Sequence, residues 1–392
     1  MATLFLIVFL DLVGFGMIIP VLPFYAEHLG ISPSLVIFLF GVYSLGQLFG
    51  APLWGALSDR AGRKPVLLAT LAANAAANVV LAFASNAWQL TASRLVSGLA
   101  AGNISIAYAY VADVTADAER PRALGLLGAA FGLGFILGPA IGGALGGGDA
   151  DTANIERAAL AAAVMSLAAL ITTFRLRESH DAEHRAHASR QPRGMQWRLV
   201  SRPGLRELLA VTLIVVGAVS MLQGTFSLFS ASYLGVSPRH LGLIFAFIGA
   251  LAVGVQAGLI GRLTARYGAE TLTRVGALVV VVALVLIPFS PNVWVALVPM
   301  GLYGIGSALF SPSISALISR TAAPTERGAV MGLFQGVSSL GRVVGPMAAS
   351  GVAALAGLRV PFWVAAVISL GGVAMLHPPA AAAASPPAQE DR

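Results

Sequence analysis

The stretch "WGALSDRAGRKPVLL", residues 54–68, places one acid and three bases within the six residues from Asp59 to Lys64. Charge is scarce elsewhere, because Asp, Glu, Lys and Arg make up only 10% of the 392 residues, whereas they make up about a quarter of a soluble domain. Hydrophobic residues make up 57%, and the mean hydropathy is +0.83. Since a soluble fold cannot bury so much apolar surface, the composition predicts a membrane protein in which this charged stretch is a loop outside the bilayer.

Apolar runs of about 18–25 residues have the length that a membrane-spanning helix needs. The first run has no basic segment before it and no small-residue cleavage site after it, so we expect a retained span and not a secretory signal. The sequence therefore predicts an all-α integral membrane protein with twelve transmembrane helices. We place them at residues 4–24, 35–57, 66–85, 88–112, 121–145, 157–175, 206–229, 239–261, 271–290, 293–315, 327–351 and 358–376.

Residues 176–205 are polar and poor in aliphatic side chains, which predicts a cytoplasmic linker between two six-helix bundles at 1–175 and 206–377. The Pro- and Ala-rich residues 378–392 are typical of a disordered cytoplasmic tail. The linker histidines His180, His184 and His187 could bind a metal ion, but so loose a cluster is more typical of a solvated linker, and we predict no metal site.

The basic residues indicate the orientation of the chain. With the N-terminus inside, 19 of the 24 Lys and Arg residues fall on the inner side, three fall on the outer side, and Arg94 and Arg342 fall within spans. This asymmetry predicts a multi-pass protein of the inner (plasma) membrane with both termini in the cytoplasm. The same asymmetry explains the high calculated pI of about 10.3, because the bases mark the cytoplasmic side of the membrane. We therefore expect the lipid bilayer as a partner and no nucleic acid. We also expect a monomer. The chain has no cysteine, which excludes disulfides and thiolate metal sites.

Two pairs of segments suggest an internal duplication. "GALSDRAGR" (55–63) aligns with "GRLTARYGA" (261–269) and pairs Gly62 with Gly268, an offset of 206 residues. "ERPRALGLLGAAFGLGFILGP" (119–139) aligns with "ERGAVMGLFQGVSSLGRVVGP" (326–346) at an offset of 207 residues. Two matches at nearly one spacing predict a repeated six-helix unit. Parallel repeats around a central cavity suit a transporter whose halves rock against each other.

Four motifs give the chain a resemblance to the major facilitator superfamily, in its twelve-helix drug:proton antiporter branch. Residues 55–64 resemble the loop signature between helices 2 and 3, and "LTASRLVSG" (90–98) resembles the fourth-helix motif. "GLGFILGPAIGG" (132–143) resembles the fifth-helix antiporter motif, and Asp11 with Pro20 and Pro23 resembles the first-helix motif. Within the branch the sequence is most similar to tetracycline efflux proteins. The resemblance implies two pseudo-symmetric six-helix bundles.

The resemblance also implies a role for the charged loop. The acid at Asp59 would face the N-terminal end of helix 11, which attracts a carboxylate, and Arg63 would pair with Asp113 at the end of helix 4. Such contacts would form a latch that holds the cytoplasmic gate shut; the alternative is an ordinary basic loop. The residues assigned to this gate are Gly55, Asp59, Arg60, Gly62, Arg63, Lys64 and Asp113.

Asp11 is the main candidate for proton coupling. It is the clearest acid inside a span, and a buried carboxylate is costly unless it is paired or protonated. The alternative is an acid near the helix end that reaches cytoplasmic water. The resemblance gives Arg94 a part in coupling, and the alternative there is an arginine satisfied by nearby polar groups. At 1.5 Å per residue the two lie about 10 Å apart in depth, so no direct ion pair is expected.

The fifth-helix motif has Gly134, Gly138 and Gly142 at four-residue spacing, followed by Gly143, with Pro139 between them. Small residues on one face allow close helix packing, and proline removes a backbone donor and bends the helix. We expect this face to form a bendable, leak-proof contact between the two halves.

Polar residues on apolar spans predict a mostly neutral, partly aromatic substrate cavity; each alone is more often a helix-packing hydrogen bond. Arg342 could line this cavity, bind an anion or have a structural partner. The cavity residues predicted are Tyr43, Gln47, Asn103, Tyr108, Gln223, Gln256, Tyr303, Gln335, Ser339 and Arg342.

The function predicted is proton-coupled antiport that exports drug-like or tetracycline-like small molecules by alternating access. The alternatives are a metabolite, sugar or lipid transporter or uniporter, and a transport-inactive membrane receptor. Lys64 is the only lysine and follows Arg63, so the chain has no Walker A loop; we expect no enzyme activity and no cofactor. Spans 3 and 9 lack the acids of tetracycline carriers, with Asn74 and Asn78 in span 3. Efflux is therefore better supported than tetracycline as the substrate.

Overall fold

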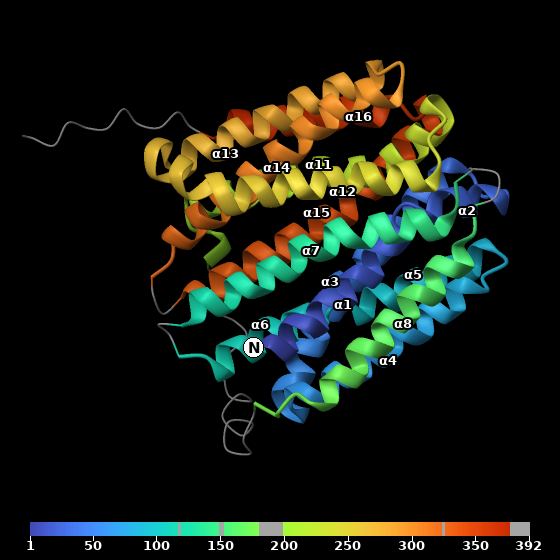
Figure 1. Cartoon of the computed structure of the whole chain (residues 1–392). Coiled ribbons are helices and arrows are strands. Elements are labelled where there is room, and N and C mark those ends of the chain that lie inside the picture. The colour runs from blue at the N-terminus through green and yellow to red at the C-terminus, as the bar shows by residue number, and fades with distance from the viewer. Residues whose placement is uncertain (117–118, 149–152, 180–198, 324–325, 377–392) are drawn as a thin grey trace, which may run out of the picture.

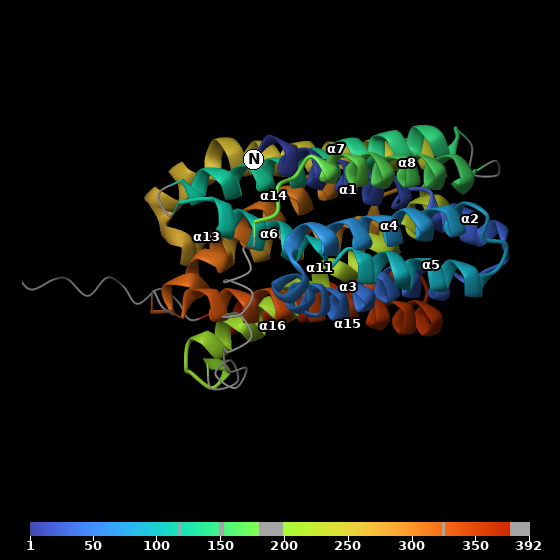
Figure 2. The same cartoon turned by 90° about the horizontal axis from the view of Figure 1, so that it is seen from below.

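The computed structural model describes residues 1–116, 119–148, 153–179, 199–323 and 326–376, and all regular structure within them is helical. The helices of both halves run along one long axis, as the two perpendicular views show (Figures 1 and 2). The predicted tail and residues 180–198 of the predicted linker, including the three linker histidines, lie outside the described residues.

The first half has two spans that are interrupted within the bilayer. The span predicted at 4–24 breaks near Pro20, because proline cannot donate the backbone hydrogen bond. The span predicted at 88–112 breaks at Ala101 and Gly102, where a β-carbon on Gly102 would overlap the backbone of Gly50. The helices of this half are α1 (Ala2–Ile18), α2 (Leu22–His28), α3 (Pro33–Ala61), α4 (Arg63–Ala82), α5 (Ala87–Ala100), α6 (Asn103–Val114), α7 (Arg120–Gly146) and α8 (Ile155–Phe174).

The second half follows the same order. Its elements are α11 (Leu205–Leu234), α12 (Pro238–Gly254), the π-helix η1 (Val255–Leu259), α13 (Ile260–Leu286), the 3-10 helix η2 (Ile287–Phe289), α14 (Val293–Arg320), α15 (Arg327–Ala356) and α16 (Val360–Met375). Helix α13 contains a turn at Gly268 with φ 79° and ψ 156°, so the apolar segment Pro238–Phe289 makes two crossings. The described residues thus provide twelve helical crossings, which confirms the predicted fold class.

Backbone geometry repeats between the halves. Gly62 and Gly268, paired by the sequence alignment, have φ of 100° and 79°, a region that favours glycine. Gly30 and Gly235 likewise have φ of 69° and 61°. The side chains of Asn86 and Asn292 cap α5 and α14 by accepting from the backbone N–H three residues ahead. These matched turns and caps make the two bundles pseudo-symmetric.

Two large aromatic side chains also repeat. Trp88 and Trp294 follow the asparagine caps of α5 and α14, and each is 77% exposed. In water such exposure would be unfavourable, but tryptophan is enriched where a bilayer meets water. Both residues lie at the start of a span that runs toward the linker, so they mark one face of the membrane for both halves.

The two halves meet mainly along two helix pairs, α7 with α12 and α3 with α15, and α11 makes smaller contacts with α2 and α3. We call the end of the molecule where α1 begins and α8 ends the linker end, and the other the far end. At the far end a β-carbon on Gly143 would overlap Pro238 O and Gly242 Cα, and Ser350 Oγ donates to Ser34 O over 2.8 Å. Figure 1 shows α7 and α12 diverging from there toward the linker end. The halves are therefore closed at the far end.

Candidate functional site

A central cavity lies between the halves. It consists of two adjoining spaces of about 290 and 960 Å³, which share Tyr108, Phe135, Gln223 and Arg342 as lining residues. The larger space reaches Gly125 near the linker-end start of α7 and Gln256 in the π-helix η1. Eight of the predicted cavity residues line these spaces: Tyr43, Gln47, Tyr108, Gln223, Gln256, Tyr303, Gln335 and Arg342.

Two predicted cavity residues have other positions. Asn103 is buried on α6 and donates to Asp11, and Ser339 accepts a hydrogen bond of 2.9 Å from Arg342 Nη2. Sequence reasoning predicted the tyrosines of the wall but missed its phenylalanines, Phe15, Phe40, Phe131 and Phe135. Nothing in a single sequence separates an apolar side chain that faces a cavity from one that faces lipid, because both surroundings favour the same residue types.

Asp11 lies in the interior of the first half. Its side chain is on α1, and the residue is 7% exposed. Oδ1 accepts a hydrogen bond of 3.0 Å from Asn74 Nδ2, and Oδ2 accepts one of 3.2 Å from Asn103 Nδ2. Asn74 Nδ2 also donates to Ser166 Oγ at 3.2 Å. The carboxyl group is therefore held by neutral amides from α4 and α6, and it does not occupy the water-facing position of the alternative interpretation.

Arg94 connects this carboxyl site with the central cavity. It is 4% exposed, and its Nε and Nη2 atoms are buried without a hydrogen-bond partner among the described residues. Asp11 and Arg94 line a small pocket of about 20 Å³, and Arg94 also lines the 290 Å³ space. The described side chains form no Asp11–Arg94 ion pair. A buried guanidinium with free donors is costly, so this group favours an anionic partner.

Tyr43 lines both of the spaces that Arg94 lines. It shares the small pocket with Asp11 and Arg94 and the 290 Å³ space with Arg94 and Arg342, and its ring stacks on Phe15 with centroids 4.7 Å apart. Its position depends on Gly98 of the fourth-helix motif, where a β-carbon would overlap the Tyr43 carbonyl oxygen. The close approach of α5 to α3 thus places Arg94 and Tyr43 at the same wall of the cavity.

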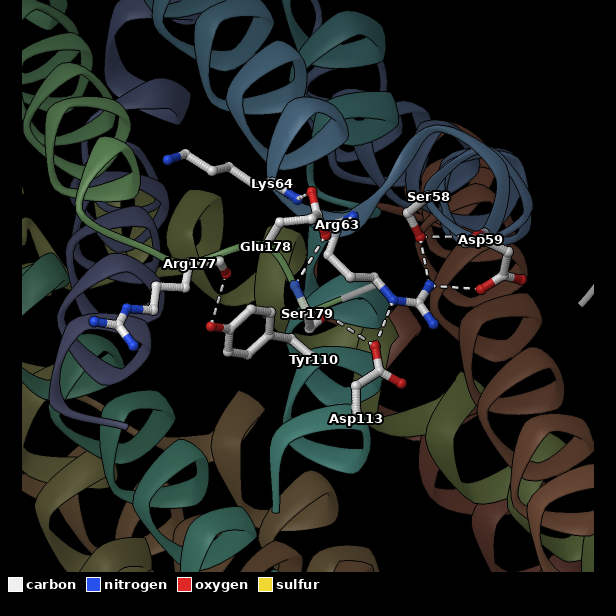
Figure 3. Close-up of polar contacts among 10 residues, drawn as sticks. Ser58, Asp59, Arg63, Lys64, Tyr110, Asp113, Arg177, Glu178 and Ser179 are labelled. Carbon is white, nitrogen blue, oxygen red and sulfur yellow. Dashed lines mark hydrogen bonds and ion pairs between the residues drawn. The ribbon is translucent and has the colours of Figure 1, made fainter. Parts of the chain in front are cut away.

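The charged loop at the linker end forms a network around Arg63 (Figure 3). Arg63 Nη1 donates to Asp59 Oδ1 over 2.6 Å and to Ser58 Oγ over 2.7 Å, and Arg63 Nε donates to Asp113 Oδ2 over 3.0 Å. Ser179 Oγ donates to the same Asp113 oxygen over 3.1 Å. The structure thus brings Asp59, Arg63 and Asp113 together within the first half.

Glu178, which the sequence analysis assigned only to the linker, belongs to this network. Its Oε1 accepts from Arg63 N at 2.8 Å and its Oε2 accepts from Lys64 N at 3.1 Å, so the carboxylate caps the N-terminus of α4. A β-carbon on Gly62 would overlap this carboxylate. Lys64 Nζ donates to Phe174 O at the end of α8 over 2.8 Å. No local sequence signal identifies such a cap, because the acid is over a hundred residues from the helix that it caps.

The other gate residues have looser surroundings. Gly55 has only Ser105 Oγ near its β-carbon position, at 3.8 Å, so this glycine makes no close helix contact here. Arg60 is exposed. The polar contacts of Asp59 among the described residues go to Arg63 and not to α15. A latch between the halves at this loop therefore remains a prediction for a state that is closed at the linker end.

Replacing Glu178 by Ala should loosen the first turn of α4. Losing a carboxylate cap costs roughly 1–2 kcal/mol, which makes local opening roughly 5–30-fold more frequent. We expect peptides that cover residues 63–66 to exchange their amide hydrogens faster by this factor, as measured by hydrogen–deuterium exchange mass spectrometry. The control variant Glu156→Ala, at the exposed start of α8, should leave the exchange of these peptides unchanged. Unaltered exchange in Glu178→Ala would show that the cap does not hold α4.

The fifth-helix motif divides its contacts between the two halves. The glycines at four-residue spacing face α1: β-carbons on Gly138 and Gly142 would overlap Gly16 and Met17. The contact between the halves is made by other positions of the motif: Pro139 and Gly143 approach Gly242 on α12, and Phe135 and Ile136 approach Gly249 on the same helix. The expectation that the whole glycine face joins the halves is therefore corrected, because a stripe of period four faces one neighbour only.

An ion pair ties the loops of the second half. Arg202 donates from Nη1 and Nη2 to the two carboxylate oxygens of Glu326 at 2.7 and 2.8 Å. These hydrogen bonds hold the pKa of Glu326 below its usual range and raise the pKa of Arg202. The pair joins the start of α11 to the start of α15, and both side chains are at the linker end.

Comparison with known proteins identifies the family. The family model of the Major Facilitator Superfamily matches residues 4–284 and 208–392 in two overlapping parts. The chain belongs to the Major Facilitator Superfamily. This matches the resemblance carried by the loop and helix motifs, and it makes the protein a multi-pass membrane transporter of that superfamily.

Relatives in the superfamily include resistance proteins. The chain is 31% identical over 351 residues to the class C tetracycline resistance protein of Escherichia coli, covering 86% of this chain and 85% of that protein. It is 28% identical over 377 residues to multidrug resistance protein 2 of Bacillus subtilis (strain 168), covering 94% and 92%. These similarities confirm the resemblance to tetracycline and drug efflux proteins.

Solved structures of the superfamily have the same fold. The crystal structure of the human organic anion transporter MFSD10 matches with a TM-score of 0.70 and 26% identity, covering 96% of this chain and 98% of that one. The nucleoside transporter NupG matches with a TM-score of 0.75 and 14% identity, covering 95% and 98%. The NupG similarity shows the fold alone.

Proposed function

We propose that this chain is a proton-coupled antiporter that exports drug-like small molecules. The observation that carries the proposal is the position of Asp11, a buried carboxyl group whose hydrogen-bond partners among the described residues are the amides of Asn74 and Asn103, and which lines a small pocket with Arg94. Because Arg94 also lines the central cavity, a change of charge at Asp11 alters the field at the substrate site. An acid inside a span is a functional site by default, since its burial is expensive.

Alternating access is supported by the contacts between the halves. They are closed at the far end through Gly143 and Ser350, while the cavity extends to Gly125 near the linker end. With the N-terminus in the cytoplasm, as the basic residues predict, this arrangement is inward-facing. Rocking of the two pseudo-symmetric bundles would then present the same cavity to the outside.

The cavity wall supports a hydrophobic or amphiphilic aromatic substrate. Four phenylalanines and the rings of Tyr43 and Tyr108 line the smaller space, with a few amides between them. Such a wall suits drug-like compounds, and the relatives named for drug and tetracycline resistance agree with it. A cationic metal–tetracycline complex fits less well, because no Asp or Glu is among the described residues that line the two spaces.

Everted membrane vesicles from cells that produce the protein provide the test. After a proton gradient is established and followed with a pH-sensitive dye, a panel of drugs is added one compound at a time. We expect at least one compound to release protons from the vesicles, and a protonophore to abolish its accumulation. Vesicles without the protein should show neither effect.

Two outcomes would overturn the proposal. Substrate flux that does not respond to the proton gradient would indicate a uniporter of a metabolite or lipid. Absence of flux for every compound, together with a tightly bound protein partner, would indicate a receptor on this fold.

A further inference from the structure

The central cavity has an unusual charge distribution. The described residues that line its two spaces include Arg94 and Arg342 but no Asp or Glu. Arg94 comes from α5 in the first half and Arg342 from α15 in the second half. Both line the same space of about 290 Å³, so two positive charges from opposite halves face one small volume.

In the part of the chain that the structure describes, neither arginine forms an ion pair with an acid. Arg94 is 4% exposed, and its Nε and Nη2 atoms have no hydrogen-bond partner among the described residues. Arg342 Nη2 donates to Ser339 Oγ on its own helix, and no ion pair involves it within the described part of the chain. Guanidinium groups are best satisfied by planar or branched oxyanions, which accept several of their donors at once.

From this geometry we infer that the cavity binds amphiphiles with an anionic group, a carboxylate or a sulfonate, placed between Arg94 and Arg342 and attached to an aromatic body. The body lies against Phe15, Phe131 and Phe135, which line the same space. The inference rests on the proposed transport function, since it assigns the substrate class of the same cavity. It disfavours permanent cations, because a cation in this space would lie beside two arginines, with no carboxylate among the described residues that line it.

The arrangement also accommodates exchange for a proton. Antiport requires the substrate to be bound while Asp11 is ionised. Two arginines balance two negative charges, one on the substrate and one on Asp11, so this state is electrically neutral. Because Arg94 and Arg342 belong to different halves, an anion between them also attracts the halves toward each other on the cavity side, which favours closure around the substrate.

A matched pair of dyes tests the charge requirement. The probes are 8-anilino-1-naphthalenesulfonate and N-phenyl-1-naphthylamine, which share the aromatic body and differ by the sulfonate. Binding to the full chain in lipid nanodiscs is measured by calorimetry, with empty nanodiscs subtracted. We expect the sulfonate to bind roughly tenfold or more tightly than the neutral amine, as a charged hydrogen bond contributes.

The variants assign the preference to the arginines. Arg342→Gln and Arg94→Gln should each reduce the sulfonate preference about tenfold while leaving affinity for the neutral amine within about twofold. Arg342→Lys keeps the charge and should retain part of the preference, which separates loss of charge from misfolding. Arg157→Gln, an exposed arginine at the start of α8, is the matched control and should behave as wild type.

Equal affinity of the wild-type protein for the two dyes would overturn the inference, as would equal losses for both dyes in Arg342→Gln. The result is independent of the proposed antiport. In Asp11→Asn the sulfonate preference should persist although drug-driven proton release is lost. Proton release by neutral drugs without any sulfonate preference would leave the antiport proposal standing and refute the anion site.

Discussion

Replacing Asp11 by Asn should abolish drug-driven proton release and the ability to build a drug gradient. Asparagine keeps the size of the side chain and its place between the amides of Asn74 and Asn103, but it carries no titrating proton. One proton moving through 100 mV supplies about 2.3 kcal/mol, which sustains a concentration ratio of roughly fifty. We expect this ratio to fall to about one in proteoliposomes that contain the variant, since passive exchange then equilibrates the drug.

The measurement needs two controls. Glu156→Gln removes an acid that is exposed at the start of α8 and should leave the drug gradient intact. Drug exchange between equal concentrations on the two sides should persist in Asp11→Asn, which shows that the variant is folded and still alternates. Proton release at the wild-type level in Asp11→Asn would refute the assignment of Asp11 as the coupling group.

Replacing Gly143 by Val should prevent closure at the far end and stop transport. A β-carbon at this position meets backbone atoms of Pro238 and Gly242, so no change of rotamer relieves the overlap. Overpacking of this kind costs about 1–3 kcal/mol, which corresponds to a population shift of roughly 5- to 150-fold away from the arrangement described here. The variant should therefore accumulate in the state that is open at the far end.

The native chain has no cysteine, so one introduced thiol reports this shift without interference. Ser350→Cys places it at the α3–α15 contact, and its reaction rate with a membrane-impermeant maleimide should rise in the Gly143→Val background. Gly371→Val, on α16 with no neighbour within 4 Å of its β-carbon position, should not raise it. Gly138→Val should instead lower the folded yield, because its overlap is with α1 in the same half. An unchanged rate in Gly143→Val would show that the packing at Gly143 does not hold the far end closed.

Much of the fold could be predicted because the bilayer imposes a simple rule. Each crossing needs a long apolar run, and the helix starting at Val293 and the charged turn at Gly62 lie where hydropathy and charge placed them. The π-helix at Val255–Leu259 was not predictable in this way, since one additional residue per turn leaves hydropathy unchanged. The helix break near Pro20 comes from the missing backbone N–H of proline. The break near Gly102 depends on the close approach of Gly50 from another helix, which the sequence does not show.

The candidate site was predictable where charge is rare. Asp11, Arg94 and Arg342 stand out in the sequence because a charged residue inside a span demands an explanation. Their partners did not stand out: Asn74 was noted only as the residue found in place of an acid, yet its amide holds Asp11. The capping role of Glu178 depends on its neighbours in the folded chain, which residue spacing alone does not give. The same holds for the different contacts of Gly142, which packs on α1, and Gly143, which packs on α12.

The closure at the far end is made twice, by α7 with α12 and by α3 with α15, and the internal duplication relates these two seams to each other. When two rigid bundles rock about a site between them, the far end opens fully only if both seams part. A ligand that bridges either seam would therefore oppose this opening. We expect an inhibitor that binds across one seam on the far face to stop transport.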